Sequence, residues 1–155
     1  MAKAWTDDDA LVEGLADHLF DMIYKLPKYF LHMDELARSY DLTYSTMQIL
    51  CLLRSGEISI GEISDRLGIA KPNVTPLVEG LCHRGLLERH RSDGDRRKVM
   101  VMLLPAGIEM ADSIRATICD QMKEWPKDYN VSEMKRLNRA LATALEMADD
   151  IMARR

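Results

Sequence analysis

The sequence SIGEISDRLGIAKPNVTPLVEGLCHR, residues 59–84, carries signals for two short helices and a tight turn between them. Ser59 and Glu62 have the spacing of a capping box, which opens a helix. Gly68 is typical of the position just after a helix ends. A second helix is expected over Lys71–Arg84, because apolar residues recur there at intervals of three and four: Val74, Leu77, Val78, Leu81 and Cys82. This arrangement predicts a helix-turn-helix.

The pattern changes from a helical to an alternating period after Gly85. Residues 86–91 and 98–104 read as two strands. Ser92-Asp-Gly-Asp95 between them supplies turn-forming residues. We therefore expect a β-hairpin, called the wing below, with a basic tip made by Arg91, Arg96, Arg97 and Lys98.

Helices are also expected on both sides of this segment. Residues 6–40 have helical spacing with Thr6 as the N-cap, but Pro27 interrupts them, so the segment is either one kinked helix or two shorter ones. Thr43 is placed to cap a further helix that ends before Gly56.

Two more helices follow the wing. Pro105 suits the first turn of a helix that ends near Trp125-Pro126. Ser132 is placed to cap the last one. The expected fold is therefore mainly α-helical with a small β-hairpin wing, an α+β arrangement. It comprises a winged helix-turn-helix lobe (43–104) and a helical dimerisation region (6–40 and 105–153) within one domain, 1–155.

The distribution of charge favours a polyanionic partner. The net charge of the chain is −4, but residues 71–98 carry seven Lys or Arg against four Asp or Glu, a local charge of +3. The remaining residues carry −7. A basic segment on an acidic body is an electrostatic footprint for nucleic acid.

The second helix and the wing hold the candidate DNA-binding residues. The second helix of a helix-turn-helix fits the major groove, where Asn pairs with adenine and Lys donates to guanine. Arginine suits a narrow minor groove. Asp95 lies close enough in sequence to orient Arg97 by a charge-assisted hydrogen bond. The helix candidates are Lys71, Pro72, Asn73, Thr75 and Pro76, and the wing candidates are Arg91, Asp95, Arg96, Arg97 and Lys98.

These residues resemble the MarR family of bacterial regulators. The matching segments are Leu67-Gly-Ile-Ala-Lys-Pro-Asn-Val-Thr75, Leu77-Val78, Leu81, Arg84-Gly-Leu-Leu-Glu-Arg89, Asp95-Arg-Arg97, Leu103 and Ala106-Gly107. The resemblance implies a homodimer held by the terminal helices, binding of double-stranded DNA at a pseudo-palindromic operator, and repression relieved by a small organic effector or an oxidant. The chain departs from the family at Ala70, Pro76 and Leu104, where a capping hydroxyl, a polar or basic residue and a Thr are usual.

An effector pocket is expected around Pro27. Tyr24, Tyr29, Phe30 and Met33 are the candidate lining residues. The alternative is that these side chains belong to the core or to the dimer interface.

Other classes of function find less support in the sequence. No catalytic motif, metal motif or cofactor loop is present, so an enzyme is not expected. The four histidines, His18, His32, His83 and His90, place no two ligands on one helical turn. Cys51 and Cys82 read as small core residues, while Cys119 is less determined. The competing binding function is a winged-helix protein-interaction module without specific DNA binding.

The expected location is the cytoplasm. The N-terminus has no secretory pattern, and three unpaired cysteines suit a reducing compartment. The longest apolar run, Val99–Leu104, is too short to span a bilayer, so no membrane association is expected.

Overall fold

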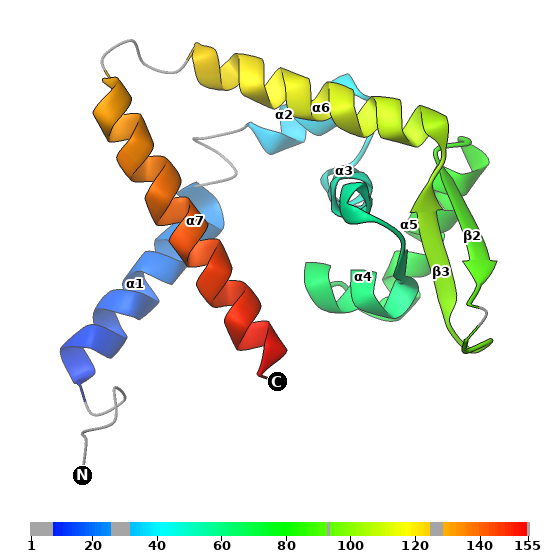
Figure 1. Cartoon of the computed structure of the whole chain (residues 1–155), viewed down its shortest axis with the longest axis horizontal. Coiled ribbons are helices and arrows are strands. Elements are labelled where there is room, and N and C mark those ends of the chain that lie inside the picture. The colour runs from blue at the N-terminus through cyan, green and yellow to red at the C-terminus, as the bar shows by residue number, and fades with distance from the viewer. Residues whose placement is uncertain (1–7, 26–31, 93, 125–128, 155) are drawn as a thin grey trace. The chain divides into compact units, whose positions relative to one another are not determined.

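The computed structural model describes residues 8–25, 32–92, 94–124 and 129–154 (Figure 1). The chain forms two compact units, Met1–Ile118 and Cys119–Arg155. Among the described helices, none is both long and apolar enough to cross a membrane.

The segment before residue 40 contains two helices, α1 (Asp9–Lys25) and α2 (Met33–Ser39), which is the second of the two expected arrangements. The Asp8 carboxylate accepts a hydrogen bond from the Leu11 amide at 3.1 Å, so it caps the first turn of α1. The predicted cap, Thr6, and the predicted break, Pro27, lie outside the described residues.

The helix-turn-helix forms where the sequence predicts it. Helix α3 (Tyr44–Leu52) begins after the Thr43 cap and continues into a 3₁₀ turn, η3 (Leu53–Ser55). Helix α4 (Ile60–Leu67) begins with the predicted capping box, in which the Glu62 amide donates to Ser59 and the Ser59 amide donates to Glu62. Gly68 ends α4 with φ 63°, a left-handed conformation that favours glycine.

Helix α5 (Lys71–His83) is the second helix of the helix-turn-helix, the recognition helix of the sequence prediction, and the wing follows it as strands β2 (Leu87–Arg91) and β3 (Val99–Leu103). A two-residue strand, β1 (Ile58–Ser59), pairs with β3 and extends the hairpin into a three-stranded antiparallel sheet with order β1-β3-β2. The sequence did not predict β1, because two residues show no period and the partner of Ile58, Val101, lies 43 positions away.

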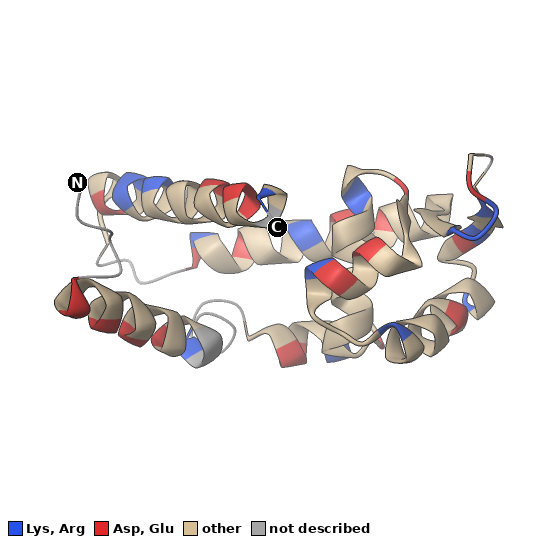
Figure 2. Cartoon of the chain, turned by 90° about the horizontal axis from the view of Figure 1, so that it is seen from below, with Lys and Arg blue, Asp and Glu red and all other residues tan. Residues whose placement is uncertain are grey.

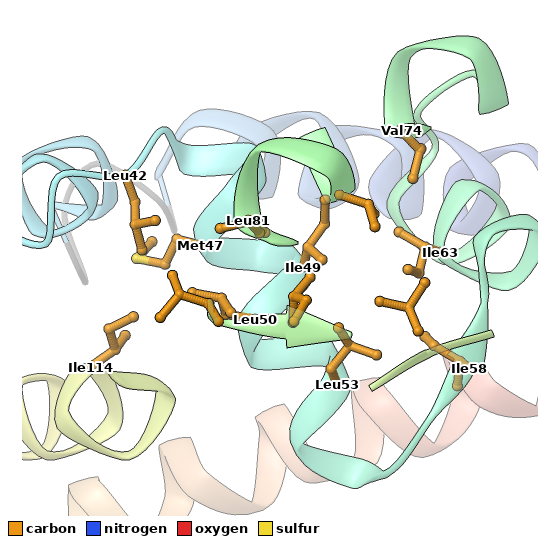
Figure 3. Close-up of a cluster of buried hydrophobic side chains, with 14 of the residues drawn as sticks. Leu42, Met47, Ile49, Leu50, Leu53, Ile58, Ile63, Val74, Leu81 and Ile114 are labelled. Atoms are coloured by element: carbon orange, nitrogen blue, oxygen red, sulfur yellow. The ribbon is translucent and has the colours of Figure 1, made fainter. Parts of the chain in front are cut away.

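The core of the lobe is built around α3, whose side chains at Met47, Ile49 and Leu50 are fully buried (Figure 3). Ile63 from α4 and Ile114 from α6 (Pro105–Lys123) join the same cluster. Three residues of the recognition helix also enter it: Val74, Val78 and Leu81. This packing fixes which face of α5 is turned to solvent.

Helix α7 (Val131–Ala153) forms most of the second unit. Ser132 is not its cap, contrary to prediction. Asn130 Oδ1 accepts hydrogen bonds from the amides of Ser132 and Glu133 at 2.9 and 3.1 Å, and Glu133 accepts one from the Asn130 amide at 2.8 Å. Asn130 and Glu133 therefore make a capping box of their own, two positions before the expected start.

Large apolar side chains are exposed along both α1 and α7. Leu19 is 55% exposed and Leu145 is 67% exposed. Other exposed apolar residues on these helices are Leu11, Val12, Leu15, Phe20, Met22, Val131, Met147 and Ile151. Apolar surface on this scale is typical of a protein–protein interface.

Candidate nucleic-acid interface

The outer face of the recognition helix carries the predicted contact residues. Lys71, Pro72, Asn73 and Pro76 are exposed on α5, opposite the buried Val74 and Val78. Thr75 is half-buried, and its hydroxyl donates to the Lys71 carbonyl at 3.4 Å.

The N-terminus of α5 has no side-chain cap. Ala70 occupies the N-cap position, and its backbone carbonyl accepts hydrogen bonds from the amides of Asn73 and Val74 at 2.8 and 3.3 Å. Pro72 stands in the first turn, where a missing amide proton costs little. Pro76 lies inside the helix and leaves the Pro72 carbonyl without its usual helical donor.

The tip of the wing is held by local hydrogen bonds that leave its cationic side chains exposed. The Lys98 amide donates to the Asp95 carbonyl at 2.8 Å, and the Arg91 guanidinium donates to the Arg96 carbonyl at 3.2 Å. Arg96, Arg97 and Lys98 are all exposed.

Asp95 makes the hydrogen bond to Arg97 that the sequence predicts. Its carboxylate accepts it at 3.0 Å from the backbone amide of Arg97. A short carboxylate bonds readily to the amide two residues later, which is the geometry of an Asx turn. Asp95 therefore shapes the tip through the backbone of Arg97.

A groove of about 720 Å³ lies between the first half of α5 and the wing. The helix contributes Lys71 and Thr75, and α4 contributes its first turn at Ile60 and Gly61. The wing contributes Arg89, His90, Arg91, Arg97, Lys98 and Val99. None of the described residues that line this groove is acidic. Figure 2 shows the same concentration of Lys and Arg on the wing.

Arg89 and His90 belong to this groove although the sequence did not single them out. Arg89 donates to Glu79 of α5 at 2.7 Å, which ties the strand to the recognition helix. His90 Nε2 lies 2.8 Å from a Glu57 carboxylate oxygen, just before β1. The alternating period of β2 places Arg89 on the same face as Arg91, so the sequence pattern could have identified Arg89 as a candidate contact residue. The contact of His90 with Glu57 depends on β1, which the sequence did not predict.

The thiols of Cys51 and Cys82 differ in exposure but share a raised pKa. Cys51 is exposed, contrary to the expectation of a core residue, because Ile49, Leu50 and Leu53 occupy the buried side of that turn. Desolvation raises the pKa of the Cys51 and Cys82 thiols above the ordinary value. A raised pKa disfavours the reactive thiolate. Among the described residues, no group of His, Cys, Asp and Glu is placed to hold a metal ion.

The predicted effector pocket falls mostly outside the described part of the chain. Tyr29 and Phe30 lie outside the described residues, as does the side chain of Tyr24. Met33 is half-buried and packs against the core of the lobe. This agrees with the alternative interpretation of Met33 as a core residue.

A helix-turn-helix followed by an arginine-rich hairpin beside its second helix defines the winged helix-turn-helix class of DNA-binding proteins. Residues 40–98 match the family model of the MarR family. The chain is 28% identical to the HTH-type transcriptional regulator SarZ of Staphylococcus haemolyticus over 102 residues, covering 65% of this chain and 67% of SarZ. It is 23% identical to the HTH-type transcriptional regulator MgrA of Staphylococcus aureus over 148 residues, covering 94% and 97%. The match of residues 40–98 to the family model and the likeness to these two regulators make the chain similar to the MarR family of transcriptional regulators.

Solved structures share this fold. Wild-type MarR from E. coli aligns with a TM-score of 0.69 at 22% identity, covering 82% of this chain and 96% of MarR. A mutant of MepR from S. aureus, solved bound to an oligodeoxyribonucleotide, aligns with a TM-score of 0.59 at 19% identity, covering 86% and 97%.

Proposed function

We propose that this chain regulates transcription by binding a pseudo-palindromic operator as a two-fold dimer, with α5 in the major groove and the wing in the minor groove. The observation that carries the proposal is the cationic groove between α5 and the wing. Side chains that neutralise phosphates release condensed counterions, which supplies sequence-independent affinity for duplex DNA. The same groove lies beside exposed polar groups on the first turn of α5.

Base recognition is assigned to the first turn of the recognition helix. Lys71 and Asn73 are exposed there and have the chemistry to read guanine and adenine edges. The Thr75 hydroxyl donates to Lys71, so its oxygen retains acceptor capacity toward a base or a water. Pro76 offers no donor, and we expect the base step nearest to it to be read by shape or by apolar contact alone.

Dimerisation is assigned to the exposed apolar faces of α1 and α7. Side chains as large as Leu19 and Leu145 are more than half exposed in a single copy. Burial of apolar surface contributes roughly 25 cal/mol per Å², so a second copy that covers these faces gains substantial free energy. A two-fold dimer presents its recognition helices to successive major grooves, about 34 Å apart.

Repression is the direction of regulation that the resemblance to the MarR family favours. A dimer bound across a promoter blocks transcription, and a small organic effector that prefers a different spacing of the two recognition helices relieves the block. Such an effector acts only through its difference in affinity between the two spacings. DNA must then weaken effector binding by the same factor.

Selection from a pool of random duplexes tests the proposal. We expect the purified full chain to enrich an inverted repeat whose half-site centres lie about one helical turn, or a multiple of it, apart. Affinity for the enriched duplex should fall steeply with salt, with a log–log slope of about −0.9 for each phosphate neutralised. No enrichment, together with a slope near zero, would contradict DNA binding and favour a protein-interaction module.

A further inference from the structure

The corner between α2 and α3, residues 40–42, is held rigidly by backbone hydrogen bonds. The amides of Tyr40 and Leu42 donate to the Ala37 carbonyl at 3.1 and 2.9 Å, and the Asp41 amide donates to Arg38 at 3.0 Å. Asp41 adopts a left-handed conformation with φ 54°. This corner has little freedom to absorb a displacement imposed from either side.

The end of the recognition helix is attached to this corner. Arg84 is the C-cap of α5, and its Nη1 donates to the Asp41 carbonyl at 2.7 Å. Its Nη2 donates to the Tyr40 carbonyl at 3.4 Å. The planar guanidinium has a fixed fork geometry, so two bonds to adjacent carbonyls define the orientation of the helix end as well as its position.

Helix α6 is attached to Tyr40 through the hydroxyl group of that residue. The Tyr40 hydroxyl lies 2.7 Å from Thr117 Oγ1 on α6. The Thr117 hydroxyl donates its only proton to the Ser113 carbonyl at 3.1 Å. Tyr40 is therefore the donor to Thr117, and its carbonyl is an acceptor from Arg84.

We propose that Tyr40 and Arg84 are positioning residues that couple α6 to the recognition helix and thereby set its orientation on DNA. This inference rests on the proposed function. Helix α6 leads directly into the second unit, which begins at residue 119, so the coupling connects the proposed dimerisation region with the DNA-reading surface. The 13 residues of α5 make a lever of about 20 Å. A tilt of a few degrees at Arg84 then moves the first turn by about 1 Å, which is enough to spoil base contacts.

Arg54 provides a matched control. Its Nε and Nη2 donate to Asp112 Oδ1 at 3.1 and 2.8 Å, which joins η3 to α6. The side chains of Arg54 and Arg84 are 39% and 36% exposed, and each variant to Gln removes one positive charge. These two hydrogen bonds of Arg54 connect α6 to the lobe without reaching α5 or the corner at residues 40–42.

The test compares affinity for the duplex enriched by the wild-type chain with affinity for a scrambled duplex of the same composition. The measured quantity is the ratio of these two affinities, enriched over scrambled. We expect Tyr40→Phe, Thr117→Val and Arg84→Gln each to lower this ratio at least threefold, and Arg54→Gln to change it less than twofold. Tyr40→Phe combined with Thr117→Val should lower the ratio no further than either variant alone, because both remove the Tyr40–Thr117 hydrogen bond and the Thr117–Ser113 bond lies within α6. A purely stabilising role would lower the melting temperature and leave the ratio unchanged.

Ratios within twofold of wild type for folded Tyr40→Phe and Thr117→Val would overturn the coupling and leave DNA binding intact. An equal loss in Arg54→Gln would also overturn it. If Arg84→Gln fails to fold, Arg84→Lys replaces it, with the same threefold loss expected because Lys lacks the fork. A wild-type chain that shows no preference between the two duplexes would overturn both the coupling and the proposed function.

Discussion

Gly107, in the first turn of α6, lies directly against the backbone of Leu86 at the start of the wing. A Cβ at position 107 would stand 2.1 Å from the Leu86 carbonyl oxygen. The same oxygen accepts a hydrogen bond from the Leu104 amide at 3.0 Å. The carbonyl therefore cannot move away from a larger residue without losing that bond.

We expect Gly107→Ala to lower the free energy of unfolding by about 1–3 kcal/mol, the usual cost of overpacking against an unyielding neighbour. Urea unfolding followed by circular dichroism measures it. Gly80→Ala is the matched control, because no atom lies within 4 Å of a Cβ built at that exposed helical position. Gly80→Ala should raise the free energy of unfolding by roughly 0.5–1 kcal/mol. If both variants lost stability, or if neither did, the close approach at Gly107 would be contradicted.

A serine at position 70 should stabilise the recognition helix. Ala70 is the N-cap and provides no side-chain acceptor. Pro72 has no amide proton, and the Asn73 amide at the third helical position donates to the Ala70 carbonyl at 2.8 Å. Ala70→Ser supplies an oxygen to that amide, with an expected gain of about 0.5–1 kcal/mol in the free energy of unfolding. Ala70→Val, which adds bulk without an acceptor, is the control in the same denaturation series. Equal stability of the two variants would show that the cap is not limiting.

Local signals made the lobe predictable, and long-range contacts account for what was missed. The capping box at Ser59 and Glu62 and the stop at Gly68 are complete within a few residues, so the sequence alone specifies them. Strand β1 exists only because Ile58 meets Val101 in the folded chain. The attachment of Arg84 to the corner at residues 40–42 spans more than 40 positions and has no periodic signal.

Local signals also specified parts of the candidate site. The exposed face of α5 followed from the helical period, because Val74, Val78 and Leu81 had to face inward. The hydrogen bond between Asp95 and Arg97 was also predictable, because it joins residues only two positions apart. The donor is the Arg97 backbone amide, as in an Asx turn.

The start of α4 should depend on pH. Hydrogen bonds from the Ser59 amide and hydroxyl lower the pKa of the Glu62 carboxyl below its ordinary value. A lowered pKa in the folded state contributes stability above the unfolded pKa, and that contribution is lost as the pH falls through the folded value. We expect the stability difference between wild type and Glu62→Gln to be positive at pH 7 and to shrink steadily below about pH 4. Urea unfolding across this range measures the difference. In a Ser59→Ala background the effect of Glu62→Gln should be smaller but should persist, because the backbone amide at position 59 still donates to Glu62. A difference that is constant with pH would refute the mechanism.

A charge on the exposed apolar face of α7 should break the proposed dimer without unfolding the chain. Leu145 is 67% exposed in one copy, so Leu145→Asp removes little packing within that copy. In a dimer that buries this face, the new carboxylate would lose its hydration. Light scattering coupled to size exclusion should then report a mass near the 17.7 kDa of one chain. Thr143→Asp, an exposed position two residues away on another side of α7, should stay dimeric. If Leu145→Asp keeps twice the chain mass, α7 does not form the interface at this face.

The wing should contribute affinity through its arginines. Arg97 lines the cationic groove, and Arg96 is exposed at the same tip while its carbonyl is held by Arg91. Arg97→Ala and Arg96→Ala remove exposed guanidinium groups and leave the backbone bonds of the turn in place, so the fold should persist. We expect each variant to bind the enriched duplex several-fold more weakly, with the larger effect at Arg97. The salt slope should shrink by about one for each phosphate that the variant no longer neutralises.

Arg115→Ala separates a wing contact from a general loss of charge. Arg115 is exposed on α6 and is not among the residues that line the groove. Its removal lowers the net charge by the same amount as either wing variant. Affinity and salt slope should therefore stay near wild type in Arg115→Ala, measured by fluorescence anisotropy at four salt concentrations. Parallel losses in all three variants would mean that net charge governs binding and that the wing makes no contact of its own. A wing residue that neutralises a phosphate contributes to both the affinity and the salt slope, so its loss must change both quantities together.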